Sequence, residues 1–94
     1  MEYEKNLEVV GKHGLNLKPS NELINIKRKL EGEYGVNITL SYKEEIIPHA
    51  LYLLSRGLER GDSLKVRVEG NSRKEALESL IKLLPSELQY KELC

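Results

Sequence analysis

Two histidines and one cysteine are the side chains of this 94-residue sequence best suited to nucleophilic chemistry. The imidazoles of His13 and His49 each offer a ring nitrogen with a free lone pair, which can accept a phosphoryl group or bind a metal ion. Two histidines without a third ligand form an incomplete metal site, so we expect no metal and no cofactor. Cys94 is the last residue, where a side chain is rarely held in place, so we do not expect it to act as a nucleophile.

The charge balance excludes two classes of partner. Lysine plus arginine number 15, and aspartate plus glutamate also number 15, which gives a net charge of zero. Nucleic acids and anionic membranes both require a basic face. The basic run at residues 27–29 is diluted by Glu22, Glu31 and Glu33 and is typical of a solvated helix face. We therefore expect neither a nucleic-acid nor a membrane partner.

Cysteine content and hydropathy predict a cytoplasmic protein. A single cysteine cannot form an internal disulfide, which is typical of the reducing cytosol. No apolar run approaches the ~20 residues that span a membrane. The first five residues carry no hydrophobic signal-peptide region.

The helices and strands of the fold must position these histidines and their neighbours. The first two elements that the sequence predicts are a strand and a helix. Residues 3–10 are expected to form the strand. Asn16 is a good N-cap residue, so we expect its side-chain oxygen to accept a hydrogen bond from an amide of the first helical turn. Pro19 is tolerated in that turn, and Gly32 and Gly35 should end the helix. Apolar residues recur at helical spacing within it: Leu23, Ile24, Ile26 and Leu30.

The middle of the chain predicts a hairpin followed by a short helix. Residues 36–42 alternate strictly between apolar and polar side chains, which is typical of a strand. Residues 43–45 are expected to turn the chain into a short strand at residues 46–47. Pro48 blocks further strand pairing. Residues 49–55 are then expected to form the short helix.

A fourth strand and a last helix follow. Residues 64–68 alternate between apolar and charged side chains, which predicts a strand with one wet face. Ser72 and Glu75 are spaced as a capping box at the start of a helix. Pro85 should stop that helix. Residues 86–94 are expected to form a C-terminal tail.

The predicted order β-α-β-β-α-β-α indicates an α+β fold, with a four-stranded antiparallel sheet covered on one face by three helices. We expect a single domain over residues 1–85 and the tail at residues 86–94. The side chains expected to be mostly buried are Leu7, Val9, Leu23, Ile26, Leu30, Ile38, Leu53, Val66, Leu77, Leu80 and Ile81.

Three stretches carry a resemblance to a known family. Residues 12–19, KHGLNLKP, resemble the pattern N/H-G-L/I-H-A-R-P, and residues 54–62, LSRGLERGD, resemble L-x-L-G-L-x-x-G. Residues 68–70, VEG, precede a capped helix, as in the same family. In this order and spacing, over about residues 3–84, the chain resembles the histidine-containing phosphocarrier protein (HPr) family of the phosphotransferase system. An apparent two-residue insertion lies in residues 31–35.

The departures from the family pattern bear on function. The family's histidine at the start of the first helix accepts a phosphoryl group from phosphorylated enzyme I and passes it to sugar-specific acceptors. Asn16 takes that position here, and a carboxamide nitrogen is not a nucleophile because its lone pair is delocalised. Lys18 replaces the family's arginine, keeping the charge but losing the planar fork. Ser20 and Asn21 replace two small residues, and His49 takes the position of the regulatory serine of Gram-positive members.

The resemblance implies an HPr-like regulatory or protein-binding module that is neither an enzyme nor itself a phosphocarrier. We expect a protein partner of unknown identity and a monomer or weak dimer. Two alternatives stay open: a phosphocarrier whose acceptor has moved to His13 or His49, and an HPr fold recruited for an unrelated role. The residues expected to contact an anion or a partner are Asn16, Leu17, Lys18, Ser20, Asn21, His49, Ala50 and Leu54.

Overall fold

The computed structural model describes residues 2–91, and for Glu2 and Lys91 only the backbone. Cys94 therefore lies outside the described residues. None of the helices in this range is long and apolar enough to cross a membrane. The strands are β1 (Glu2–Val9), β2 (Asn37–Tyr42), β3 (Glu45–Ile46), β4 (Ser63–Glu69) and β5 (Leu88–Lys91). The helices are α1 (Leu17–Tyr34), α2 (Ala50–Ser55) and α3 (Arg73–Leu83).

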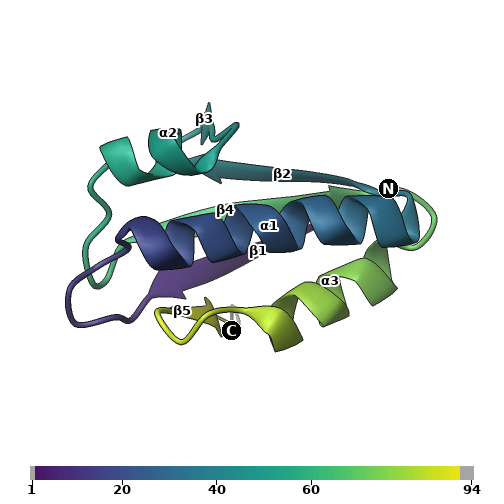
Figure 1. Cartoon of the computed structure of the whole chain (residues 1–94). Helices are drawn as coiled ribbons and strands as arrows, with labels where there is room; N and C mark the ends of the chain where they lie inside the picture. Colours follow the sequence, from purple (N-terminus) through teal and green to yellow (C-terminus); the bar gives the residue numbers. More distant parts are fainter. Residues whose placement is uncertain (1, 92–94) are drawn as a thin grey trace.

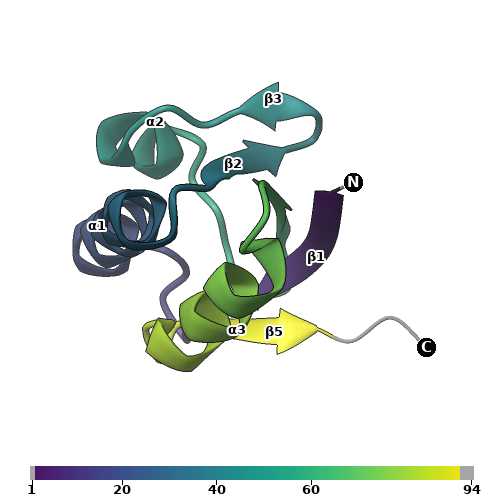
Figure 2. The same ribbon diagram turned by 90° about the vertical axis from the view of Figure 1, so that its right-hand side faces the viewer.

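The strands form one antiparallel sheet in the order β3-β2-β4-β1-β5. All three helices lie on the same face of this sheet, and the other face is left uncovered by the described chain (Figures 1 and 2). In the central strands, Leu7 lies opposite Leu64 and Ile38 opposite Val68, with all four side chains buried under the helices. The predicted α+β class and its single helical layer are confirmed.

The sheet has five strands, so the expected number of four is wrong. Residues 88–91, which belong to the expected tail, instead pair with β1 in antiparallel register, with Leu88 opposite Val9 and Tyr90 opposite Leu7. Leu88 is buried and Tyr90 packs against the core. Alternation over the four residues of β5 is too short a signal to predict a strand, but it places the side chains of Leu88 and Tyr90 on the inner face of the sheet.

The hydrophobic core follows the predicted periodicities. Nine of the eleven side chains expected to be buried are buried. The other two, Ile26 and Ile81, are partly buried and pack against the same cluster. Full burial of one such side chain contributes about 1.5–3 kcal/mol to the free energy of folding. The buried cluster is therefore the main source of the protein's stability.

Two predicted helix signals behave differently in the structure. Gly32 lies inside α1, which continues to Tyr34 because the Tyr34 ring packs on the core and its hydroxyl is 2.9 Å from Ser79 Oγ. Gly35 ends the helix in the left-handed conformation, at φ 65°. At the start of α3, Ser72 occupies the N-cap but makes no side-chain capping bond, so the predicted capping box does not form.

Candidate functional site

Helices α1 and α2 lie side by side and border two adjoining hollows, which we call the α1–α2 surface. The first, of about 590 Å³, is lined by Asn16, Leu17, Lys18, Asn21, Glu22 and Asn25. The second, of about 360 Å³, is lined by Asn21, Ile24, Asn25, Arg28, His49, Ala50 and Leu51. Asn21 and Asn25 border both hollows and join them into one surface. Six of the eight expected contact residues are thus brought together.

The other two expected contact residues lie elsewhere. Ser20 is 0% exposed, so it cannot contact a partner. The reason is helical periodicity, because Ser20 lies three and four residues before Leu23 and Ile24 and shares their inward face. Leu54 is only half-exposed and lines neither hollow. Leu51, on the outer side of α2, is 67% exposed instead.

Asn16 occupies the N-cap position of α1, and its side chain is exposed. Its backbone is extended, with φ −86° and ψ −168°, and its carbonyl accepts the Ser20 N–H at 3.2 Å. The side chain makes no capping bond, so the predicted cap is wrong in this respect. An N-cap side chain accepts from the amide of the second or third helical residue. The third is Pro19, which has no N–H, and the carboxamide remains available to a partner.

The loop before α1 is fastened to the connection between α2 and β4, and this fixes the position of Asn16. Leu15 N–H donates to the Leu58 carbonyl at 3.0 Å, and both leucine side chains are buried. Gly14 packs so closely on the Leu58 backbone that a Cβ would overlap the carbonyl oxygen, and its φ is +76°. The first and second resembling stretches therefore form one structural unit.

His49 opens α2 as its N-cap residue. Its Nδ1 accepts the Tyr52 N–H at 3.1 Å, and the two rings meet edge to face at 6.3 Å between centroids. One ring nitrogen is thus used to hold the helix. The exposed imidazole also borders the second hollow.

A polar cluster ties α2 to the edge strand β3. Tyr52 O–H donates to Glu45 Oε2 at 2.6 Å, and Arg56 Nη1 lies 2.9 Å from Glu45 Oε1. The Arg56 guanidinium also lies over the Tyr52 ring, 5.1 Å from its centroid. The hydrogen bond to Glu45 raises the pKa of Tyr52, and burial and the negative charge of Glu45 raise it further. These contacts hold the short helix against β3.

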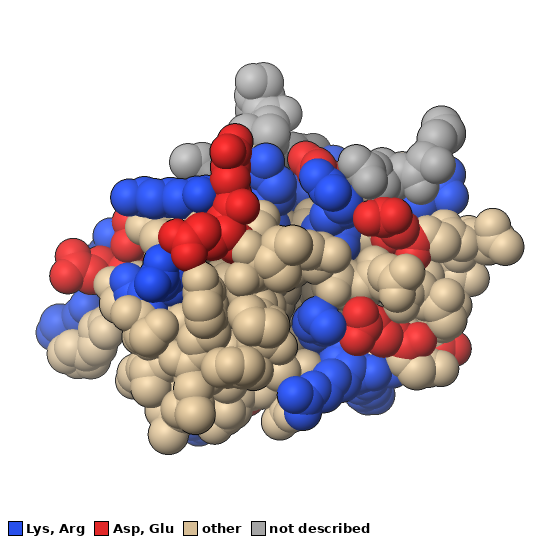
Figure 3. All heavy atoms as spheres, turned by 90° about the horizontal axis from the view of Figure 1, so that it is seen from above, with Lys and Arg blue, Asp and Glu red and all other residues tan. Residues whose placement is uncertain are grey.

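The α1–α2 surface is largely uncharged at its centre. Seen from the side of α2, uncharged side chains gather over that helix and charged ones lie around them (Figure 3). Lys18 and Arg28 bring positive charge to the first and second hollow respectively, and Glu22 is the acidic residue of the first. Such a surface suits a partner protein with apolar contacts and an acidic rim.

His13 is exposed in the loop before α1 and lines neither hollow. The structure therefore does not bring it together with His49 on this surface. Within residues 2–91, no group of three or more histidine, cysteine, aspartate or glutamate side chains is arranged to hold a metal ion.

Sequence reasoning missed several residues of this surface, chiefly Glu22, Asn25 and Arg28. A signal for two of them was present, because residues four and seven positions after Asn21 share its helical face. That rule selects Asn25 and Arg28. Leu51 carried no such signal, since one apolar helical turn does not reveal which leucine faces outward.

Comparison with known proteins bears on this site. The family model described as "PTS HPr component phosphorylation site" matches residues 3–86. The phosphocarrier protein HPr of Vibrio cholerae serotype O1 is 26% identical over 82 residues, which cover 87% of this chain and 94% of the relative.

Solved structures share the fold. HPr from Bacillus anthracis superposes with a TM-score of 0.61 at 19% identity, covering 89% of this chain and 98% of that one. HPr-C-His from Thermoanaerobacter tengcongensis superposes with a TM-score of 0.63 at 21% identity, covering 90% of this chain and 93% of that one. The histidine-containing phosphocarrier protein of a mycoplasma superposes with a TM-score of 0.62 at 15% identity, covering 88% of this chain and 90% of that one.

Proposed function

The chain belongs to the HPr family of the phosphotransferase system, and from this premise we propose that it is a protein-binding or regulatory module that does not itself carry phosphate. One observation carries the proposal. An exposed carboxamide, that of Asn16, stands at the start of α1, where the family's chemistry requires an imidazole. A carboxamide can donate and accept hydrogen bonds but offers no nucleophilic nitrogen lone pair.

The surroundings of Asn16 support binding without transfer. Leu17 is 49% exposed and Leu51 is 67% exposed, one on each helix of the α1–α2 surface. Exposed apolar side chains beside uncharged polar ones are typical of a protein contact. Asn21 and Asn25 add carboxamides that can pair with a partner's backbone or side chains. We therefore propose a protein of the phosphotransferase system as the partner.

One observation favours a second candidate function, a phosphocarrier whose acceptor has moved. His49 is exposed and borders the hollow that it shares with Asn21. Its Nδ1 is used to cap α2, which leaves Nε2 as the nitrogen that could accept a phosphoryl group. We rank this candidate second because phosphorylation at Nδ1 would break the cap and Nε2 alone remains.

Titration with unphosphorylated enzyme I tests the binding half of the proposal. We expect the protein to bind through the α1–α2 surface, and Leu51→Asp to weaken the affinity at least ~10-fold because it buries a charge in the contact. Ile46→Asp is the matched control. Ile46 is 65% exposed but borders a hollow with the side chains of the uncovered sheet face, so this variant should bind like wild type.

Two results would contradict the binding half of the proposal. If Leu51→Asp and Ile46→Asp bound enzyme I with equal affinity, the contact would not involve α2. No binding of the wild-type protein would favour a recruited fold with an unrelated role.

A further inference from the structure

The side chain that caps α2 is titratable. His49 has an extended backbone, with φ −157° and ψ 172°, and its Nδ1 accepts the Tyr52 N–H at 3.1 Å. The side chains that usually cap helices accept through an oxygen atom, which stays an acceptor near neutral pH. An imidazole accepts only while it is neutral, because both ring nitrogens of its protonated form are donors. The capping bond of α2 is therefore lost when His49 is protonated, whichever way the ring is turned.

The first turn of α2 depends on this cap more than the second turn does. The helix has only six residues, and a helix of that length needs caps or tertiary contacts to form. The second turn is anchored by the buried side chain of Leu53 and by the ion pair of Arg56 with Glu45. In the first turn, by contrast, Leu51 is 67% exposed. Loss of the cap should therefore loosen residues 49–51 and leave the rest of the helix attached to β3.

Helix α1 brings a positive charge to the same place. Arg28 lines the second hollow together with His49. The N–H groups at the start of α2 add partial positive charge on the other side of the ring. A charge on His49 would be repelled by both. Protonation therefore removes the capping bond and also places a further positive charge beside Arg28 and the first turn of α2.

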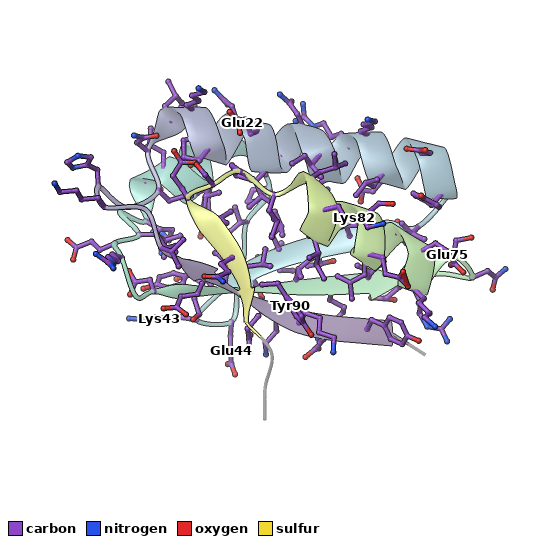
Figure 4. The ribbon with its side chains drawn as sticks, turned by 90° about the horizontal axis from the view of Figure 1, so that it is seen from below. Glu22, Lys43, Glu44, Glu75, Lys82 and Tyr90 are labelled. Carbon is purple, nitrogen blue, oxygen red and sulfur yellow. The ribbon has the colours of Figure 1, made fainter. Side chains whose placement is uncertain are left out.

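The charged residues of the neighbouring hairpin are engaged elsewhere or point away. Both carboxylate oxygens of Glu45 are bonded, one to Arg56 at 2.9 Å and the other to the Tyr52 hydroxyl at 2.6 Å. Lys43 and Glu44 form the turn between β2 and β3 and point away from the helical layer (Figure 4). The Tyr52 ring itself meets the His49 ring edge to face, at 6.3 Å between centroids. These groups hold the second turn of α2 and leave the charge of His49 to act on the first.

We propose that protonation of His49 opens the first turn of α2 and thereby weakens partner binding at the α1–α2 surface. Ala50 and Leu51 belong to that turn and line the second hollow, so their displacement removes apolar contact area. The turn is closed while the imidazole is neutral and opens as the pH falls through the range in which histidines titrate, about pH 8 to 5. The effect on binding rests on the proposed function, whereas the opening of the turn does not.

The Cα chemical shifts of Ala50 and Leu51 in the full-length protein test the opening of the turn. They are followed from about pH 7.5 to about pH 5.5, a range in which histidines titrate and ordinary glutamates stay charged. We expect them to move toward coil values with the midpoint of the His49 ring signals, as the ratio of closed to open turn falls about 5-fold. His49→Ser should abolish the change, because a hydroxyl stays an acceptor. His13→Gln, which removes the other histidine of the chain, should keep it.

Titration with unphosphorylated enzyme I at the same two pH values tests the effect on binding. Because enzyme I has titratable groups of its own, the affinity of each protein is compared with that of His49→Ser at the same pH. On this scale the wild-type protein should lose about 2- to 5-fold in affinity at the lower pH. His13→Gln should lose as much as the wild-type protein.

Three results would overturn the proposal. The first is constant Cα shifts of Ala50 and Leu51 while the His49 ring titrates. The second is the same pH dependence of these shifts in His49→Ser. The third is tighter binding of the wild-type protein at the lower pH, which would mean that the charged ring contacts an acidic group of the partner. If enzyme I bound at neither pH, the proposed function and the effect on binding would fail together, while the chemical shifts would still decide whether the turn opens.

Discussion

The backbone of Gly14 lies directly against the carbonyl group of Leu58, and this contact joins the loop before α1 to the loop after α2. The neighbouring Leu15 N–H donates to the same carbonyl at 3.0 Å. The contact places Asn16, at the start of α1, beside the chain that leaves α2, and these are the two helices that border the α1–α2 surface. This contact therefore helps to hold the start of α1 in place beside α2.

The contact predicts that Gly14→Ala is strongly destabilising. The methyl group would overlap the Leu58 carbonyl oxygen, and a residue with a Cβ is strained at a φ of +76°. We expect a loss of about 2–3 kcal/mol in the free energy of unfolding, measured by denaturant titration. Gly32→Ala is the control, because Gly32 lies inside α1 with open space around it and should gain about 0.5–1 kcal/mol. Equal effects of the two variants would show that the close contact is absent in solution.

Asn16→Ala should change stability little, in contrast to His49→Ala. The Asn16 side chain makes no capping bond, so its removal should cost less than ~0.5 kcal/mol. Removal of the His49 side chain loses the bond to Tyr52 N–H and should cost about 1 kcal/mol. Thermal unfolding of both variants measures the difference. A large loss for Asn16→Ala would mean that its carboxamide caps α1 after all.

The cluster of Tyr52 and Glu45 predicts a delayed ionisation. The hydrogen bond to Glu45 raises the pKa of Tyr52 above the ordinary value of 10.0. The pKa of Tyr52 is higher in the folded than in the unfolded protein. The stabilisation of the folded state by the Tyr52–Glu45 hydrogen bond is therefore fully present below about pH 10 and is lost as the pH rises through the folded pKa. Subtracting the ultraviolet absorbance titration of Tyr52→Phe from that of wild type isolates Tyr52. We expect its midpoint above 10 in wild type and a lower one in Glu45→Gln; equal midpoints would exclude the hydrogen bond.

The fold was predictable from the sequence where periodicity is long and consistent. Strand β4 and helix α1 each place their apolar side chains on one face over several repeats, and those side chains are buried as expected. Strand β5 was not predicted because Leu88 and Tyr90 are only two alternating positions, and their partners Val9 and Leu7 are distant in sequence. The conformation of residues 88–91 is set by their pairing with β1 and not by a local sequence signal.

The candidate site was predictable in part for the same reason. Asn16 and His49 were placed at helix starts by local signals, and the structure agrees. The burial of Ser20 and the exposure of Leu51 depend on the rotation of each helix against the sheet. Pro19, as the third helical residue, removes one of the two amides that the Asn16 side chain could cap, a local conflict between two favourable rules.

Phosphoryl transfer tests the central claim most directly. The protein and its Asn16→His variant are incubated with enzyme I and radiolabelled phosphoenolpyruvate, and acid-labile phosphate is counted. We predict no label on the wild-type protein, because the Asn16 carboxamide has no nucleophilic lone pair. We predict weak label on Asn16→His, because the helix amides and Lys18 still favour an anion there. Label on the wild-type protein would contradict the account, and its loss in His13→Gln or His49→Gln would identify the residue that had taken over the phosphate.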